Sequence, residues 1–162
     1  MSDQREIPEN TRPALYVGAM ILALVGAILN FFFEFAWWYE SSYYGYNFGL
    51  GTSFTPWLSQ LLIVILGLMF LYVLLVALQQ LYPILKVSKE VDKRIEQSGF
   101  FVSIGTIALS IIITILFYIF LGRQVETLWD DGLGTGFYAG VIAGFLCAVL
   151  FFLASKIDQQ KT

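Results

Sequence analysis

The chain has 162 residues, of which 58% are hydrophobic and 13% are charged, and it contains one cysteine and no histidine. This apolar content is more than a soluble domain of the same length can bury, so the composition predicts an integral membrane protein. The net charge of -3, without blocks of like charge, argues against nucleic-acid binding, and the lack of histidine argues against haem and metal enzymes. We therefore expect no cofactor.

Four apolar segments are each long enough to cross a hydrocarbon layer of about 30 Å as a helix. They cover residues 14–36, 57–82, 99–121 and 133–155. The sequence thus predicts an all-α membrane protein, a four-transmembrane-helix bundle forming a single domain. Its connections are two external loops, residues 37–56 and 122–132, and one cytoplasmic loop, residues 83–98.

Basic residues indicate the orientation of these spans. All lysines and arginines except Arg123 lie in the two tails or in the 83–98 loop. The positive-inside rule therefore places both termini in the cytoplasm of a multi-pass protein of the plasma or cytoplasmic membrane. In the same loop Val87, Val91 and Ile95 recur every four residues, which predicts either a short interfacial helix or an extension of the second span.

The first span carries small and polar residues on one helical face, within an arc of about 100°. They are Ala19, Ala23, Gly26, Ala27, Asn30 and Glu34. Small side chains allow another helix to approach closely, so this face is expected to pack against protein. Glu34, inside "NFFFEFAWWYE", is then directed into the bundle near its outer edge, with Arg123 as its expected ion-pair partner.

The first external loop, residues 37–56, is rich in aromatic residues, glycine and serine and has no basic residue. Alternation in "YYGYNFGL", residues 43–50, predicts a small hairpin. This composition is typical of adaptable binding surfaces, although a loop folded back as an interfacial cap is the alternative. The candidate partner-binding residues are Tyr43, Tyr44, Tyr46 and Phe48.

The two middle spans differ in polarity. Residues 57–82 are almost entirely large and apolar apart from Gly67, which predicts the most lipid-exposed helix of the four. The third span instead presents a stripe of hydroxyl side chains: Ser103, Thr106, Ser110 and Thr114. Such hydroxyls form hydrogen bonds between helices or to their own backbone, and the alternative is a polar pathway across the membrane.

In the fourth span, "GFYAGVIAG" repeats glycine every fourth residue, at Gly136, Gly140 and Gly144. Tandem GxxxG faces let helix backbones pack closely in a membrane. The pattern predicts a packed helix here, from the same bundle or from another subunit.

The arrangement of loops and a tryptophan followed by Gly49 and Leu50 resembles the claudin and peripheral-myelin-protein type of tetraspan. In that family the motif is Trp, then Gly-Leu-Trp and two cysteines, and the first loop is a disulfide-stabilised sheet. This sequence has Gly51 in place of the last tryptophan and no cysteine in the loop. The resemblance implies a structural or adhesive role, or regulation of a partner channel.

Catalytic and metal sites are not expected, because the sequence offers no Ser/His or Cys/His pair and no set of metal ligands. The acidic pair in "WDDGLGTG", Asp130 and Asp131, lacks the alternating ligands of an EF-hand. We therefore expect a non-enzymatic accessory or assembly subunit that packs against the helices of other membrane proteins, in a hetero- or homo-oligomer, and against lipid. The alternatives are a self-assembling claudin-like tetraspan and a small channel or transporter.

Overall fold

A computed structural model describes residues 11–38, 41–44, 57–122 and 131–160 of the chain. The described part contains four helices, α1 (Thr11–Phe32), α2 (Trp57–Leu81), α3 (Lys89–Gly122) and α4 (Thr135–Gln160). It also contains three short strands, β1 (Glu34–Trp38), β2 (Ser41–Tyr44) and β3 (Asp131–Leu133).

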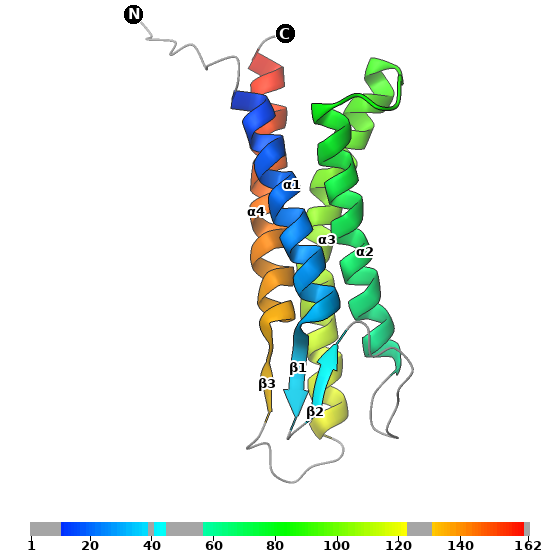
Figure 1. Cartoon of the computed structure of the whole chain (residues 1–162), viewed down its shortest axis with the longest axis vertical. Helices are drawn as coiled ribbons and strands as arrows, with labels where there is room; N and C mark the ends of the chain where they lie inside the picture. Colours follow the sequence, from blue (N-terminus) through cyan, green and yellow to red (C-terminus); the bar gives the residue numbers. More distant parts are fainter. Residues whose placement is uncertain (1–10, 39–40, 45–56, 123–130, 161–162) are drawn as a thin grey trace, which may run out of the picture.

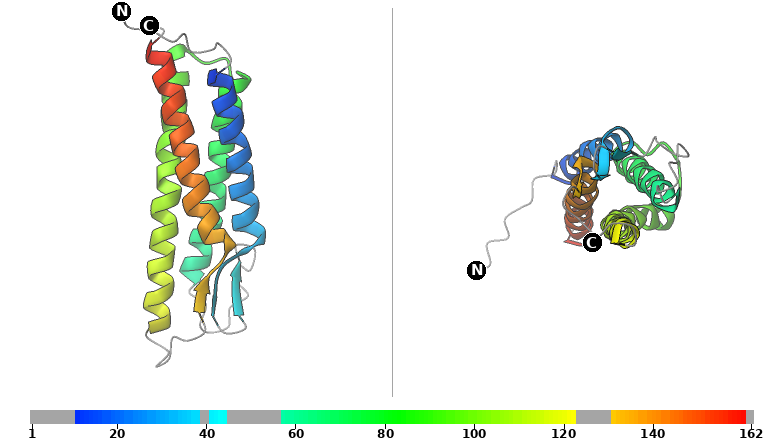
Figure 2. Two further views of the ribbon diagram at one scale, coloured as in Figure 1. Left: turned by 90° about the vertical axis from the view of Figure 1, so that its left-hand side faces the viewer. Right: turned by 90° about the horizontal axis from the view of Figure 1, so that it is seen from below.

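The helices form an antiparallel bundle in which α1 packs against α2 and α4, and α3 packs against the same two helices (Figures 1 and 2). Helices α1 and α3 therefore lie on a diagonal. All four are long and apolar enough to cross a membrane, which confirms the prediction of four apolar helices of spanning length. The start of α1, the end of α4 and the α2–α3 connection share one end of the bundle, called here the terminal end, and the strands lie at the opposite, sheet end (Figure 1).

Small residues face inward on α1 and large ones face outward. The buried face includes Ala19, Ala23 and Ala27, whereas Ile21 and Leu24 are exposed. Lipid tails are as apolar as leucine, so a large aliphatic side chain gains little by turning inward, while small ones bring two backbones together. The inward face of α1 therefore consists of small residues, whereas the inward face of a helix in a soluble protein consists of large apolar residues.

Helices α1 and α2 interlock through glycine. The Phe70 ring of α2 lies against Gly26 of α1, and the Phe31 ring of α1 lies against Gly67 of α2. Because of this packing, α2 is not the most lipid-exposed helix, and that prediction is wrong: 39% of the α2 span is buried, against 28% of the α3 span.

The first helix is shorter than predicted. It ends at Phe32, and residues 34–36, expected to continue it, belong to β1. Aromatic residues favour extended backbone, and β1 gains hydrogen-bonded partners on both sides. Of the predicted hairpin at residues 43–50, Tyr43 and Tyr44 belong to β2, which pairs with β1, and residues 45–50 lie outside the described part, so the hairpin stays a prediction.

The sheet has the order β2-β1-β3, with β1 antiparallel to both neighbours. Trp37 pairs with Ser42 of β2 on one side and with Gly132 of β3 on the other. Next to this register, the Gly134 amide donates to the Phe35 carbonyl at 2.8 Å. Strands from two distant parts of the chain thus form one small sheet at the ends of α1 and α4 (Figure 2).

The third helix begins earlier than predicted. Lys89 opens α3, so Val91 and Ile95 lie in its first turns and form neither a separate interfacial helix nor an extension of α2. The Ser88 hydroxyl accepts from the Val91 amide at 3.5 Å, and Glu90 lies in the first turn, as expected for a capped helix start. The predicted 16-residue loop 83–98 therefore shortens to the residues before Lys89.

Candidate functional site

The hydroxyl stripe of α3 donates to the backbone of its own helix. The Ser103 hydroxyl donates to the Gly99 carbonyl at 2.8 Å. Thr106 donates to the Ser103 carbonyl at 2.7 Å, and Ser110 donates to the Thr106 carbonyl at 2.8 Å. The Thr114 hydroxyl follows the same pattern to Ser110 at 2.9 Å. Each donor is thus satisfied within one turn of α3, and the first three side chains are fully buried.

The glycine face of α4 lies directly on this stripe. A Cβ atom added at Gly140 would collide with the Ser110 hydroxyl oxygen, and one at Gly144 would collide with that of Thr106. The structure therefore brings together two motifs that the sequence presents separately. Glycine lets the α4 backbone approach the hydroxyl oxygens, where weak Cα–H contacts to oxygen are available. Both glycines are packed inside the chain, and another subunit cannot reach them without opening the α3–α4 interface.

The small face of α1 is likewise internal. Gly26 is covered by Phe70 of α2, and the buried Cys147 thiol of α4 donates to the Ala19 carbonyl at 3.6 Å. Ala23 and Ala27 are buried beside them. The small face of α1 therefore packs against two helices of its own chain, α2 and α4.

Asn30 and Glu34 do not share a helical face, which corrects the predicted geometry. Glu34 lies in β1, where the chain has already left the helix, and its backbone carbonyl sits against Gly134 and Gly136. Asn30 is fully buried in the last turns of α1, with its amide nitrogen donating to the Gly26 carbonyl at 2.8 Å. Arg123 lies outside the described residues, so its expected ion pair with Glu34 stays a prediction.

The predicted partner-binding residues fall partly on β2. Tyr43 and Tyr44 belong to that strand, with Tyr43 in register with Ala36 and Tyr44 with Glu34. Tyr46 and Phe48 lie outside the described part of the chain.

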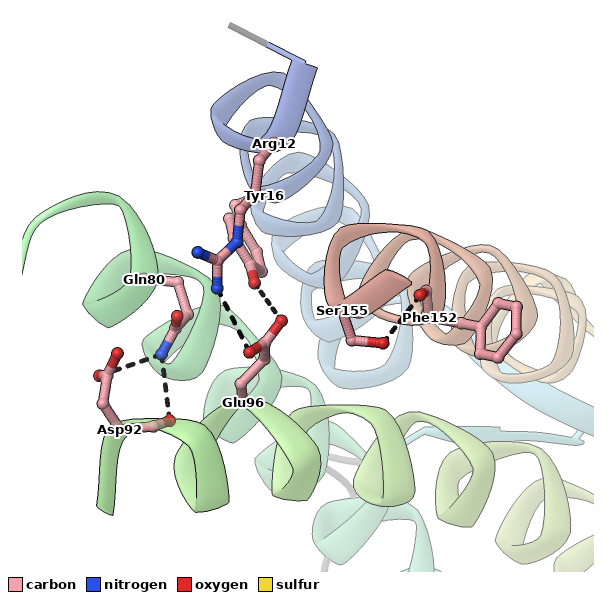
Figure 3. Close-up of polar contacts among 7 residues, drawn as sticks. All are labelled: Arg12, Tyr16, Gln80, Asp92, Glu96, Phe152 and Ser155. Carbon is pink, nitrogen blue, oxygen red and sulfur yellow. Dashed lines mark hydrogen bonds and ion pairs between the residues drawn. The ribbon is translucent and has the colours of Figure 1, made fainter. Parts of the chain in front are cut away.

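A buried ionic cluster at the terminal end was not anticipated from the sequence (Figure 3). Glu96 of α3 is only 5% exposed and accepts a hydrogen bond from the Tyr16 hydroxyl of α1 at 2.5 Å. Its other oxygen lies 3.3 Å from the Arg12 guanidinium, which also sits 5.7 Å from the centre of the Tyr16 ring. Tyr16 in turn packs edge-on against Phe151 of α4, with 5.7 Å between ring centres. The cluster therefore ties the diagonal pair α1 and α3, and reaches α4.

A signal for Glu96 was present in the sequence. Positions 96, 99, 103, 106 and 110 follow alternating steps of three and four, so Glu96 lies on the same helical face as the hydroxyl stripe, about two turns before Ser103. The predicted cytoplasmic loop, residues 83–98, includes Glu96, and the helical periodicity of the third span was not extended into that loop. A buried carboxylate requires hydrogen-bonded, charged partners, which Arg12 and Tyr16 supply.

Two glutamines fasten the α2–α3 connection at the same end. The Gln79 side chain accepts from the Leu85 amide at 3.0 Å and donates to the Leu85 carbonyl at 2.9 Å. Gln80 donates to the Asp92 carboxylate at 3.1 Å and to its backbone carbonyl at 3.4 Å (Figure 3). Side chains of α2 thus fix both the connection and the start of α3.

Within the described ranges, no group of three or more His, Cys, Asp or Glu side chains is placed to hold a metal ion. The hydroxyl stripe donates to its own backbone, and Glu96 binds both Arg12 and Tyr16. Their arrangement supports helix packing. Comparison of the chain with protein-family models, curated proteins and solved structures finds no match.

Proposed function

We propose that this protein is a non-enzymatic accessory or assembly subunit of a membrane complex, with both termini in the cytoplasm of the plasma or cytoplasmic membrane. Its helices would contact partner membrane proteins, and its aromatic external loop would contribute to recognition.

The observation that carries this proposal is the rigid attachment of the sheet to the bundle. Phe33 alone separates α1 from β1, and Gly134 alone separates β3 from α4. Side chains have little room at this junction, since a Cβ atom on Gly134 would collide with the Glu34 carbonyl. A small sheet held in this way fixes the backbone of Tyr43 and Tyr44 relative to the bundle, which lowers the entropic cost of binding a partner through these residues.

The interior of the bundle supports association over transport. Ser103, Thr106 and Ser110 hydrogen-bond within α3 and are covered by α4, so their donors are already used. Because the small-residue faces of α1 and α4 pack internally, partner helices would meet the outer surface of large apolar side chains. This changes the predicted contact surface without changing the predicted kind of partner.

Affinity purification from native membranes in a mild detergent, followed by mass spectrometry, tests the proposal. We expect a stable set of other membrane proteins to be recovered with the chain. The double change Tyr43→Ser and Tyr44→Ser is expected to reduce the recovery of these partners about tenfold, which corresponds to a loss of roughly 1.4 kcal/mol of binding free energy. Tyr82→Ser, in the α2–α3 connection at the opposite end of the bundle from β2, is the control and should keep the partners. Recovery of the chain alone as a monomer would contradict the proposal.

A self-assembling, claudin-like tetraspan is the second candidate. The observation that favours it is the antiparallel sheet at one end of the bundle, since a sheet in the first external loop belongs to the family that the sequence resembles. In the purification above, this candidate predicts homo-oligomers in place of different partners.

A further inference from the structure

The α2–α3 connection exposes large apolar side chains next to basic ones. Tyr82, Ile84 and Leu85 are 67%, 67% and 60% exposed, immediately after the last residue of α2. We call them, together with the exposed basic residues that follow, the connection surface. Its basic residues are Lys86, Lys89, Lys93 and Arg94.

The backbone that carries these apolar side chains is fixed by specific hydrogen bonds. Gln79 binds both backbone groups of Leu85, and the Val87 amide donates to the Leu85 carbonyl at 3.0 Å. The Ile84 amide donates to the Tyr82 carbonyl at 2.6 Å. Exposure of three large apolar side chains within four residues would be unfavourable in water, so the surroundings of these side chains are expected to be apolar.

The electrostatic balance of this surface is positive. Among the nearby carboxylates, Glu96 is buried and paired with Arg12, whereas Asp92 accepts from the neutral Gln80 amide and counts against the basic residues. Glu90 is the remaining acidic side chain of the first two turns of α3 and lies one turn from Arg94. Four exposed basic residues therefore outnumber the carboxylates available to neutralise them.

We propose that the connection surface binds the anionic lipid headgroups of the leaflet at the terminal end. Tyr82, Ile84 and Leu85 enter the boundary between headgroups and acyl chains, while the lysines and Arg94 meet the lipid phosphates. The position supports this, because α2 spans the membrane up to Leu81 and the connection begins at the next residue. Charge complementarity selects anionic over zwitterionic lipid, since each basic side chain near a negative leaflet adds attraction. The inference does not depend on the identity of a protein partner.

The test uses the full chain reconstituted in phosphatidylcholine bilayers that contain spin-labelled phosphatidylglycerol or phosphatidylcholine. The motionally restricted fraction of each label gives the relative association constant for the two lipids. Lys86→Gln with Lys89→Gln is expected to lower the preference for phosphatidylglycerol by about fivefold, and high salt is expected to weaken it in the unchanged protein. Lys156→Gln with Lys161→Gln removes the same charge elsewhere and is expected to have a smaller effect. An equal loss in both pairs would overturn the proposal, as would no preference in the unchanged protein.

The depth of the connection surface in the membrane is measured separately, so that a change in folding is not mistaken for a change in lipid binding. Two variants, Leu85→Cys and Glu90→Cys, are made in a Cys147→Ala background, and a nitroxide label is attached to the new cysteine of each. For each label, the rate of collision with oxygen is compared with the rate of collision with a water-soluble nickel complex. The label at 85 is expected to favour oxygen and the label at 90 to favour nickel. Equal access of nickel to both positions would exclude insertion of the connection.

Discussion

The two ends of the bundle are held together by different kinds of interaction. At the sheet end, β1 joins β2 and β3 through backbone hydrogen bonds. At the terminal end, individual side chains make the joins: Glu96 links α3 to Arg12 and Tyr16, and Gln79 fastens the α2–α3 connection. Hydrogen bonds between strand backbones are kept after most side-chain substitutions, whereas a contact made by a single side chain is lost when that side chain is replaced. The terminal end is therefore expected to be more sensitive to substitution.

This difference follows from where the chain is covalently connected. At the sheet end, β1 and β3 extend directly from α1 and α4, so extended backbone is available for pairing. Next to the terminal ends of the diagonal helices α1 and α3, the described part of the chain contains no strand, and long side chains cross between the two helices. Glu96 and Tyr16 are separated by 80 residues in sequence, yet they share a hydrogen bond.

The largest effect on stability is expected from Glu96→Ala. It leaves the Arg12 charge and the Tyr16 hydroxyl without the carboxylate between them, and breaking a buried ion pair costs roughly 3–5 kcal/mol. Because the Arg12 side chain is 32% exposed, water compensates in part, and we expect the free energy of unfolding to fall by about 3 kcal/mol. Unfolding in mixed micelles, followed by circular dichroism, measures this. Glu96→Gln, which keeps an acceptor for Tyr16, should lose less; equal losses would show that the charge alone, and not the hydrogen bond from Tyr16, stabilises the cluster.

A smaller effect is expected from Tyr16→Phe. The ring stays packed against Phe151, and only the hydroxyl that donates to Glu96 is removed. A hydrogen bond to a charged group contributes about 1.5–3 kcal/mol, so we expect a loss of about 2 kcal/mol in the same unfolding measurement. In the Glu96→Ala background the same change should cost little, because its acceptor is already gone. Additive losses in the double variant would contradict a direct bond between the two residues.

The sequence predicts the spanning helices well, because an apolar run of about 20 residues has few other structures available to it. It predicts the ends of the helices less well. The aromatic residues after Phe32 suit a helix or a strand, and what selects the strand is pairing with β3, whose partner residues lie about a hundred positions away, such as Gly132 for Trp37. Local patterns do not contain that pairing.

Contacts between polar residues of different helices are likewise not contained in local patterns. The hydroxyl stripe and the glycine repeat were each visible as a helical pattern, but their contact, Ser110 on Gly140, depends on the relative rotation of α3 and α4. The predicted third span begins at residue 99, so it does not include Glu96. Following the three-four periodicity of the stripe backwards from Ser103 would have included it.

The smallest effects are expected from one chemical change made at both ends. Ser42→Ala lies in β2, where the backbone pairs with Trp37 and alanine keeps every backbone donor and acceptor, so the loss should stay below about 0.5 kcal/mol. Ser98→Ala lies at the terminal end and removes hydroxyl contacts to Tyr72 at 2.7 Å and to the Ile95 carbonyl at 2.6 Å, for a loss of about 1 kcal/mol. Unfolding of the two variants under identical conditions compares the ends directly. If Ser42→Ala cost as much as Ser98→Ala, side chains would stabilise the sheet end as well, and the distinction between a backbone-held and a side-chain-held end would not stand.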